Sequence, residues 1–177
     1  MKLVCSTLFL ISFLTLASYI FPVLAKAENQ FINIVNPVRI SSYTPNPAES
    51  LKNEYEVASI HKLPATWLLT FDAIENKSVI EVVKNMDSKQ EIGIFLEVTP
   101  NFAKASDVTS HDTGSWHHAN SVFLVGYTQS ERILLIDMVF KKFKEKLGFH
   151  PTSVGSWWTD SFSLSYMKEK YGITTNL

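Results

Sequence analysis

The chain has 177 residues, of which 46% are apolar and 19% are charged, so it is suited to one folded domain and is neither disordered nor collagen-like. Its formal net charge of -1, from 16 basic and 17 acidic residues, excludes the basic surface that binds nucleic acid. The single cysteine, Cys5, lies in an N-terminal apolar segment. The rest of the chain therefore has no thiol for a disulfide, a zinc-thiolate site or a nucleophile.

The N-terminal segment predicts export. An apolar run at residues 3–24 follows Lys2, as in a signal peptide. Small residues then occupy the alternate positions that a signal peptidase requires: Val23, Ala25 and Ala27. The run is also long enough to span a bilayer, so an uncleaved anchor that tethers the chain to a membrane is the alternative. Either interpretation of residues 1–27 makes residues 28–177 secreted or extracytoplasmic, with a net charge of -3.

The exported part begins with a strand, a loop and a helix. A β-branched run at residues 31–35 predicts a buried strand that ends at the turn formed by residues 36–37. The loop that follows carries Arg39. Asn46 can then cap a helix whose first turn holds Pro47.

Each of the next two predicted strands is followed by a residue with a carboxylate side chain. Residues 65–71 predict a nearly continuous apolar strand with Asp72 at its carboxyl end, and Asn76 precedes a short helix with apolar residues at helical spacing. Residues 92–96 predict a third strand, which is followed by Glu97. Both carboxylates are therefore expected directly after strands.

A long connection at residues 98–127 precedes the most regular predicted helix. The connection is rich in Ser, Thr, His and Asn, and connections of this length inside a compact domain are often functional. Thr128 and Glu131 have the spacing of a capping box. They predict a helix that runs to about Leu147 and ends at Gly148.

The C-terminal residues continue the alternation. Residues 151–158 predict a fourth strand, residues 163–171 predict a helix that Gly172 ends, and Ile173 begins a fifth strand. This pattern predicts a parallel α/β sheet with helices outside, either open or part of a barrel. An eight-stranded barrel typically needs about 250 residues, so we expect the domain at residues 28–177 to be incomplete at its C-terminus.

Ligands of parallel α/β folds bind beyond the carboxyl ends of the strands. Carboxylates there could supply a general acid and a general base, because a carboxyl with a raised pKa can donate a proton while another stays ionised. The candidate catalytic residues are thus Asp72, Glu97 and Asp160, and Arg39 is a candidate substrate-binding residue. The structural alternatives are a turn former for Asp72, a solvated strand end for Glu97 and a helix N-cap for Asp160.

The segment at residues 115–120 is the part of the chain richest in side chains that could bind a ligand or a metal ion. With His111 and Asp112 it offers three imidazoles and a carboxylate, the ligand types of zinc or iron, but their spacing matches no strong metal motif. We therefore predict no metal and no cofactor, and interpret the segment as a hydrogen-bonding and stacking loop. Its candidate substrate-binding residues are Trp116, His117, His118 and Asn120.

Trp157 and Trp158 lie at the end of the fourth predicted strand. Exposed aromatic side chains at this place could form a platform for sugar rings, so both are candidate substrate-binding residues. The alternative is core packing, which we expect for at least one of them because successive strand residues face opposite sides.

Two passages resemble the polysaccharide deacetylases. Residues 64–69, Pro-Ala-Thr-Trp-Leu-Leu, are similar to one strand of that family, and residues 90–97, Gln-Glu-Ile-Gly-Ile-Phe-Leu-Glu, are similar to the strand that follows it. The resemblance implies the incomplete (β/α) barrel shared by these deacetylases and related glycoside hydrolases, with polysaccharide as the substrate class. The predicted fold class is therefore α/β, a partial (β/α) barrel with a parallel sheet and alternating helices after the N-terminal segment.

The chain departs from that family at the metal site. The family binds its metal through an aspartate after the first strand and two histidines after the third. This chain has Val35-Asn36-Pro37 at the first place, and Phe95 and Thr99 at the second. The resemblance therefore carries over no metal ligand.

The functional prediction is an exported carbohydrate-active protein, deacetylase-like or glycoside hydrolase-like, that acts on or binds cell-envelope or extracellular polysaccharide. A catalytically inactive glycan-binding or envelope interaction protein is the alternative. A third hypothesis is a truncated gene product with no activity of its own. The net charge of the chain argues against nucleic acid as a partner under each hypothesis.

Overall fold

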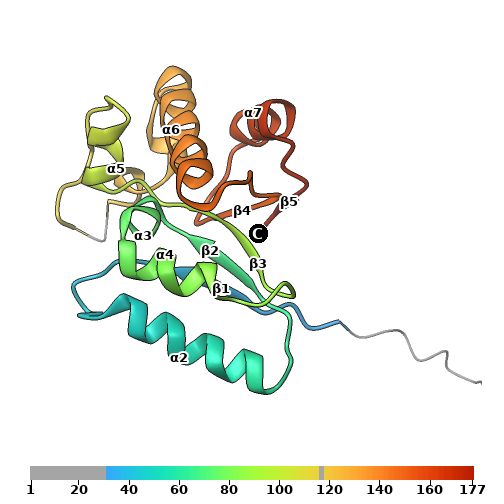
Figure 1. Ribbon diagram of the computed structural model, residues 1–177. Coiled ribbons are helices and arrows are strands. Elements are labelled where there is room, and N and C mark those ends of the chain that lie inside the picture. Colours follow the sequence, from blue (N-terminus) through green and yellow to red (C-terminus); the bar gives the residue numbers. More distant parts are fainter. Residues whose placement is uncertain (1–30, 116–117) are drawn as a thin grey trace, which may run out of the picture. The chain divides into compact units, whose positions relative to one another are not determined.

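Five parallel strands form one sheet, and their order in the sheet is their order along the chain (Figure 1). The structure is a computed structural model that describes residues 31–115 and 118–177, so the predicted signal or anchor segment lies outside the described residues. Within those ranges, no helix combines the length and the apolar composition needed to cross a membrane. The strands are β1 (Val35–Val38), β2 (Thr66–Leu69), β3 (Glu91–Leu96), β4 (Ser153–Ser156) and β5 (Thr175–Asn176).

Helices connect each strand to the next. When consecutive parallel strands are neighbours, right-handed connections place their helices on one face of the sheet. The alternation of parallel strands and helices predicted from the sequence is confirmed, and the sequential strand order is consistent with a partial (β/α) barrel. The helices are α2 (Pro47–Ile60), α3 (Phe71–Glu75), α4 (Lys77–Lys84), α5 (Pro100–Ala105), α6 (Gln129–Leu147) and α7 (Ser161–Tyr171), with short 3₁₀ turns η1 (Ala119–Ser121) and η2 (Leu124–Gly126).

One hydrophobic core joins the sheet to these helices. Alternate strand residues such as Trp67, Leu69 and Ile94 pack in it, and each is fully buried. Phe140 of α6 and Met167 of α7 meet them from the helical layer. Burial of this size is the main stabilising contribution to the fold, because it removes a large apolar area from water.

The helix ends confirm the predicted caps. Asn46 accepts a hydrogen bond from the Glu49 amide at the start of α2. Thr128 and Glu131 form a complete capping box at the start of α6. Gly148 ends that helix with a left-handed φ of 88°, a conformation that glycine adopts without the steric cost of a Cβ atom.

The first strand lies further along the chain than predicted. Residues 31–35 were expected to form it, but β1 begins only at Val35, and Phe31 and Ile32 are exposed. Pro37, which was expected to end the strand, lies within it. Because β1 is at the edge of the sheet, the missing amide hydrogen of a proline is tolerated there.

The connection after β3 also has more structure than expected. It contains the short helix α5, in which Thr99 accepts a hydrogen bond from the Phe102 amide and Pro100 occupies the first turn. This is the same cap and proline arrangement that predicted α2, so the signal was present in the sequence.

The face of the sheet opposite the helices holds Leu68 between two glycines. A Cβ atom on Gly93 would lie 2.6 Å from one methyl group of Leu68, and one on Gly155 would lie 2.5 Å from the other. Both distances are too short for carbon atoms, so glycine at these two positions allows Leu68 to be buried within the curved sheet.

Candidate functional site

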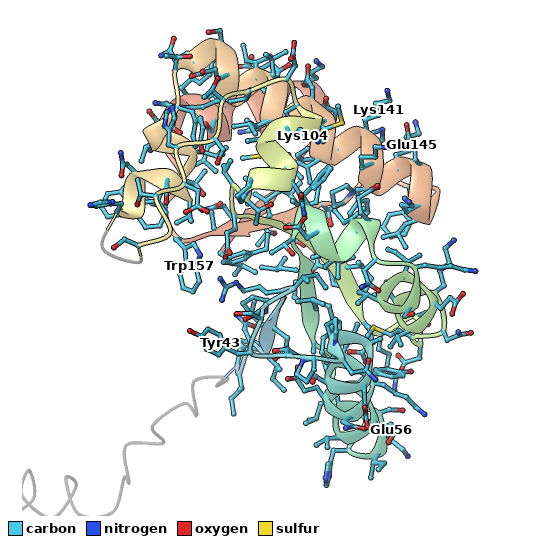
Figure 2. The ribbon with its side chains drawn as sticks, turned by 90° about the vertical axis from the view of Figure 1, so that its left-hand side faces the viewer. Tyr43, Glu56, Lys104, Lys141, Glu145 and Trp157 are labelled. Carbon is cyan, nitrogen blue, oxygen red and sulfur yellow. The ribbon has the colours of Figure 1, made fainter. Side chains whose placement is uncertain are left out.

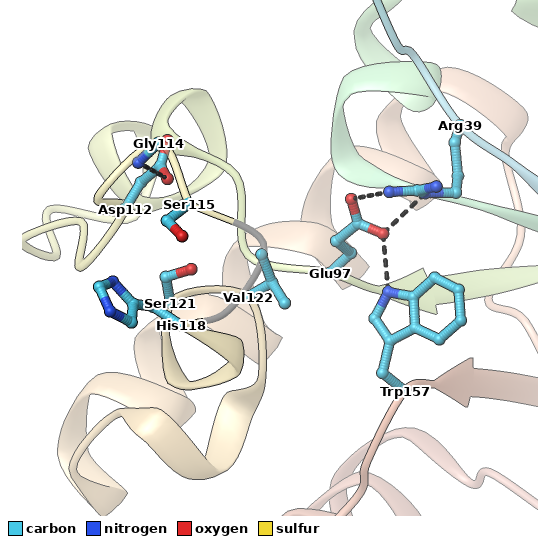
Figure 3. Close-up of a pocket in the computed structure, with 9 residues that line it drawn as sticks. All are labelled: Arg39, Glu97, Asp112, Gly114, Ser115, His118, Ser121, Val122 and Trp157. Atoms are coloured by element: carbon cyan, nitrogen blue, oxygen red, sulfur yellow. Dashed lines mark hydrogen bonds and ion pairs between the residues drawn. The ribbon is translucent and has the colours of Figure 1, made fainter.

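Three side chains from three strand ends meet around one carboxylate (Figure 3). Arg39 directly follows β1 and donates hydrogen bonds to both carboxylate oxygens of Glu97, from Nε at 2.8 Å and from Nη2 at 2.7 Å. Trp157, which follows β4, donates from Nε1 to Glu97 Oε2 at 2.9 Å. Glu97 itself follows β3 and is only 8% exposed. We call Arg39, Glu97 and Trp157 the Glu97 cluster.

The order of the strands explains why these side chains are long. β2 lies between β1 and β3, so Arg39 and Glu97 start from strands two positions apart, roughly 9–10 Å at the usual strand spacing. Side chains can bridge that distance only if both are long and extended, as those of Arg39 and Glu97 are. At the end of β2 the chain turns at once into α3, whose N-cap is Thr70.

Aromatic contacts hold the indole of Trp157 in place. The Arg39 guanidinium lies over its ring, 5.5 Å from the centroid, which is a cation-π arrangement. Phe95 packs against the same ring edge-on, with centroids 5.4 Å apart. Trp157 is nevertheless 48% exposed, so much of its ring remains accessible to a ligand.

The Glu97 cluster borders a pocket of about 240 Å³. Figure 3 shows the cluster on one side and residues of the β3–α6 connection on the other. The Val98 amide donates to the Val122 carbonyl at 2.9 Å, which ties this second wall to the end of β3. The residues of the second wall are Asp112, Gly114, Ser115, His118, Ser121 and Val122.

Tyr127 supports that second wall from behind. Its hydroxyl donates to the Ser121 carbonyl at 2.9 Å and accepts from the His111 amide at 3.3 Å. Its ring stacks on the imidazole of His111 at 4.3 Å, and burial raises the pKa of its hydroxyl. Arg132 donates from Nε to the Tyr127 carbonyl at 2.7 Å. These hydrogen bonds hold the second wall at His111, Ser121 and Val122.

The structure brings together part of the predicted site. Four candidate residues line the pocket: Arg39, Glu97, His118 and Trp157. Trp116 and His117 lie outside the described residues. The other predicted residues, Asp72, Asn120, Trp158 and Asp160, are not among the residues that line it.

Asp72 and Asp160 lie at the starts of helices. Asp72 is in the first turn of α3. Asp160 caps α7 by accepting from the Ser163 amide at 3.0 Å, and it forms an ion pair with Arg132 at 3.1 Å. Burial alone would raise the pKa of Asp160, but hydrogen bonds from Ser163 and the charge of Arg132 outweigh it and lower the pKa. The arrangement matches the N-cap alternative rather than a proton donor.

Neither tryptophan is packed in the core, which corrects the expectation for at least one of them. Trp157 is 48% and Trp158 64% exposed. The reason is that β4 ends at Ser156, so both rings follow the strand and the alternation of faces no longer applies.

The sequence did not single out most of the second wall. Gly114, Ser121 and Val122 have no chemistry that distinguishes them from other loop residues. Asp112 was considered only as a carboxylate of metal-ligand type, and Ser115 only as part of the segment at residues 115–120. The available signal was the length of the connection between β3 and α6, which predicted a functional loop but not which of its residues face the pocket.

In residues 31–115 and 118–177, no group of three or more His, Cys, Asp or Glu side chains is placed to hold a metal ion. No protein-family model, curated protein or solved structure matches this chain. The chemistry of the pocket is thus the basis on which a function can be argued.

Proposed function

We propose that this is an exported carbohydrate-active protein of the polysaccharide deacetylase and glycoside hydrolase type, which binds cell-envelope or extracellular polysaccharide in the pocket beside the Glu97 cluster. The observation that carries the proposal is Trp157, an accessible indole held against Phe95 and Arg39 at the edge of a pocket with both polar and apolar lining. Sugar rings stack their apolar faces on such rings while their hydroxyls bond to neighbouring polar groups.

The place of the pocket supports a ligand-binding role. It lies at the carboxyl ends of β1, β3 and β4, where parallel α/β proteins bind their ligands. The hydroxyls of Ser115 and Ser121 can both donate and accept hydrogen bonds, as recognition of sugar hydroxyls requires.

The hydrogen bonds of Glu97 favour binding over hydrolysis. Its carboxylate accepts two bonds from Arg39 and one from Trp157, so both oxygens are already engaged. A general acid must instead carry a proton on one of these oxygens. In this arrangement Glu97 orients Arg39 and Trp157 for the ligand.

Hydrolysis is the second candidate, because Glu97 and Asp112 line the same pocket. Two carboxyl groups on opposite sides of a glycosidic bond are the usual requirement of glycoside hydrolases. This candidate predicts release of reducing ends from a bound glycan and its loss in both Glu97→Gln and Asp112→Asn.

A glycan array tests the proposal. The full chain is expressed, the protein that is exported is purified, and binding is measured with and without a chelator. We expect binding that survives chelation and weakens at least tenfold in Trp157→Ala. Trp158→Ala is the matched control, since Trp158 is the adjacent, exposed tryptophan and is not among the pocket residues. A folded protein that binds no glycan, or equal losses in both variants, would overturn the proposal.

A further inference from the structure

Arg39 lines a second hollow as well as the pocket beside the Glu97 cluster. This hollow has a volume of about 220 Å³ and lies between the carboxyl end of β1 and the first turns of α2. Its polar lining consists of Arg39, Ser41, Thr44, Ser50 and Glu54. None of these except Arg39 was singled out from the sequence.

We propose that this hollow is a second sugar subsite, which takes the unit of a polysaccharide next to the one held beside Trp157. The inference rests on the proposed function and adds to it that the ligand is a chain rather than a single sugar. Each hollow alone is smaller than the range of about 300–1,000 Å³ typical of small-molecule pockets, and Arg39 lines both, so the two are neighbours.

The lining of the second hollow suits a sugar unit. The hydroxyls of Ser41, Thr44 and Ser50 can donate or accept, and the Glu54 carboxylate accepts from a pair of ligand hydroxyls. Half-buried Pro47 adds an apolar surface, and the buried Leu51 lies beneath it. The mixture of hydroxyl, carboxylate and apolar groups matches a pyranose, which presents hydroxyls at its edge and C–H groups on its faces.

An exposed aromatic side chain, Tyr43, lies near this hollow without lining it. It lies in the chain between Ser41 and Thr44, and it is 84% exposed. Figure 2 shows Tyr43 and Trp157 on the same side of the molecule. Trp157 lines the first pocket, and Tyr43 is exposed beside residues that line the second hollow, where a polysaccharide chain that leaves the hollow can contact its ring.

Local hydrogen bonds fix the rim of the second hollow. The Thr44 amide donates to the Ser41 carbonyl, and the Tyr43 amide donates to Ser41 Oγ, both at 3.1 Å. Ser50 and Glu54 are one helical turn apart on α2 and so lie on the same helix face. The rim is thus built on a closed turn and a regular helix.

The test is how the affinity depends on the number of sugar units in the ligand. It is measured by calorimetry with the protein that is exported when the full polypeptide is expressed. The probes are glucose, N-acetylglucosamine and mannose, each with its β-1,4-linked disaccharide and tetrasaccharide. We expect at least one series in which the disaccharide binds at least tenfold more tightly than the monosaccharide. Absence of binding in all three series would overturn the proposed function and the subsite together.

Ser50→Trp then addresses the subsite alone, because an indole fills the hollow. We expect it to reduce disaccharide affinity to that of the monosaccharide and to leave monosaccharide affinity unchanged. Ser59→Trp is the matched control, an exposed serine of the same helix that does not line the hollow. Monosaccharide binding without a gain from length, or no difference between the two variants in folded protein, would overturn the subsite and leave the proposed function standing.

Discussion

The Glu97 cluster has a chemical counterpart among the helices. Asp137 of α6 accepts hydrogen bonds from the hydroxyls of Tyr166 and Tyr171, each at 2.7 Å, and from Lys170 Nζ at 2.8 Å. The Lys170 ammonium lies over both tyrosine rings, 5.1 and 5.5 Å from their centroids. We call these four residues the Asp137 cluster. Like the Glu97 cluster, it consists of a carboxylate, a cation and aromatic donors.

The two clusters differ in what they join. The Asp137 cluster fastens α7 to α6, and the ring of Tyr171 continues into the core by stacking on Phe140 at 4.1 Å. The Glu97 cluster joins strand ends and forms one wall of a pocket. The same side-chain chemistry thus serves helix packing in one place and lines a pocket in the other. Position relative to the strand ends, rather than composition, distinguishes them.

The sharpest contrast between the clusters is expected from Glu97→Ala. It leaves the partly buried guanidinium of Arg39 without its carboxylate, at a cost of about 2–3 kcal/mol in the free energy of unfolding. It also releases Trp157, so glycan binding is expected to be lost. Urea denaturation and the glycan array measure the two effects.

Glu91→Ala is the control for that variant. Glu91 lies at the opposite end of β3, where it accepts from the hydroxyls of Thr66 and Thr152. We expect it to leave glycan binding unchanged. Retention of full binding in Glu97→Ala would contradict a role for the Glu97 cluster in recognition.

Asp137→Ala is expected to affect stability alone. Removing the carboxylate leaves three donors on α7 without their acceptor, and since the cluster is partly exposed we expect a loss of about 1–2 kcal/mol in the free energy of unfolding. Glycan affinity should not change. Glu145→Ala, on the same helix, removes only exposed ion pairs and should cost at most about 0.5 kcal/mol. A change of glycan affinity in Asp137→Ala would contradict the division between the clusters.

Exchanging the cations tests how far geometry matters in each cluster. Arg39→Lys keeps the charge but loses the bidentate contact with Glu97 that orients both side chains, so we expect glycan affinity to fall about tenfold. Lys170→Arg replaces a half-exposed point charge and should change the free energy of unfolding by at most about 0.5 kcal/mol. Calorimetric titration and urea denaturation distinguish the two results. Equal tolerance of both exchanges would count against a geometric role for Arg39.

The local structure of this protein could be predicted because it depends on neighbours in sequence. The cap at Asn46, the capping box at Thr128 and the terminator Gly148 each act within about four residues. By contrast, Arg39 and Glu97 are 58 positions apart. The alternation of strands and helices predicted that both reach one edge of the sheet, but their pairing depends on strand spacing and side-chain conformation, which no local pattern contains.

The candidates that the pocket does not include have a local explanation. The sequence predicted a strand up to residue 71, whereas β2 ends at Leu69 and Thr70 caps α3 immediately. Asp72 is therefore in a helical turn rather than at a strand end. Thr70 is a residue type that favours a helix N-cap, but the nearly continuous apolar run around it favours a strand, and the strand was predicted.

The smallest expected effect is the pH dependence of the Asp137 cluster. Burial alone would raise the pKa of Asp137, but hydrogen bonds from Lys170, Tyr171 and Tyr166 outweigh it and lower the pKa in the folded protein. A carboxyl whose folded pKa is lowered stabilises the fold above its unfolded pKa, near 3.8, and this contribution is lost as the pH falls through the folded pKa.

We therefore expect the difference in unfolding free energy between the wild type and Asp137→Asn to be constant from about pH 5 to pH 7 and to shrink below about pH 4. Urea denaturation across this range measures it. The comparison with Asp137→Asn is needed because Asp160, whose pKa is also lowered, contributes equally to both proteins and cancels in the difference. A difference that is unchanged at pH 3 would mean that the hydrogen bonds to Asp137 do not depend on its charge, and the likeness between the two clusters would then be one of shape alone.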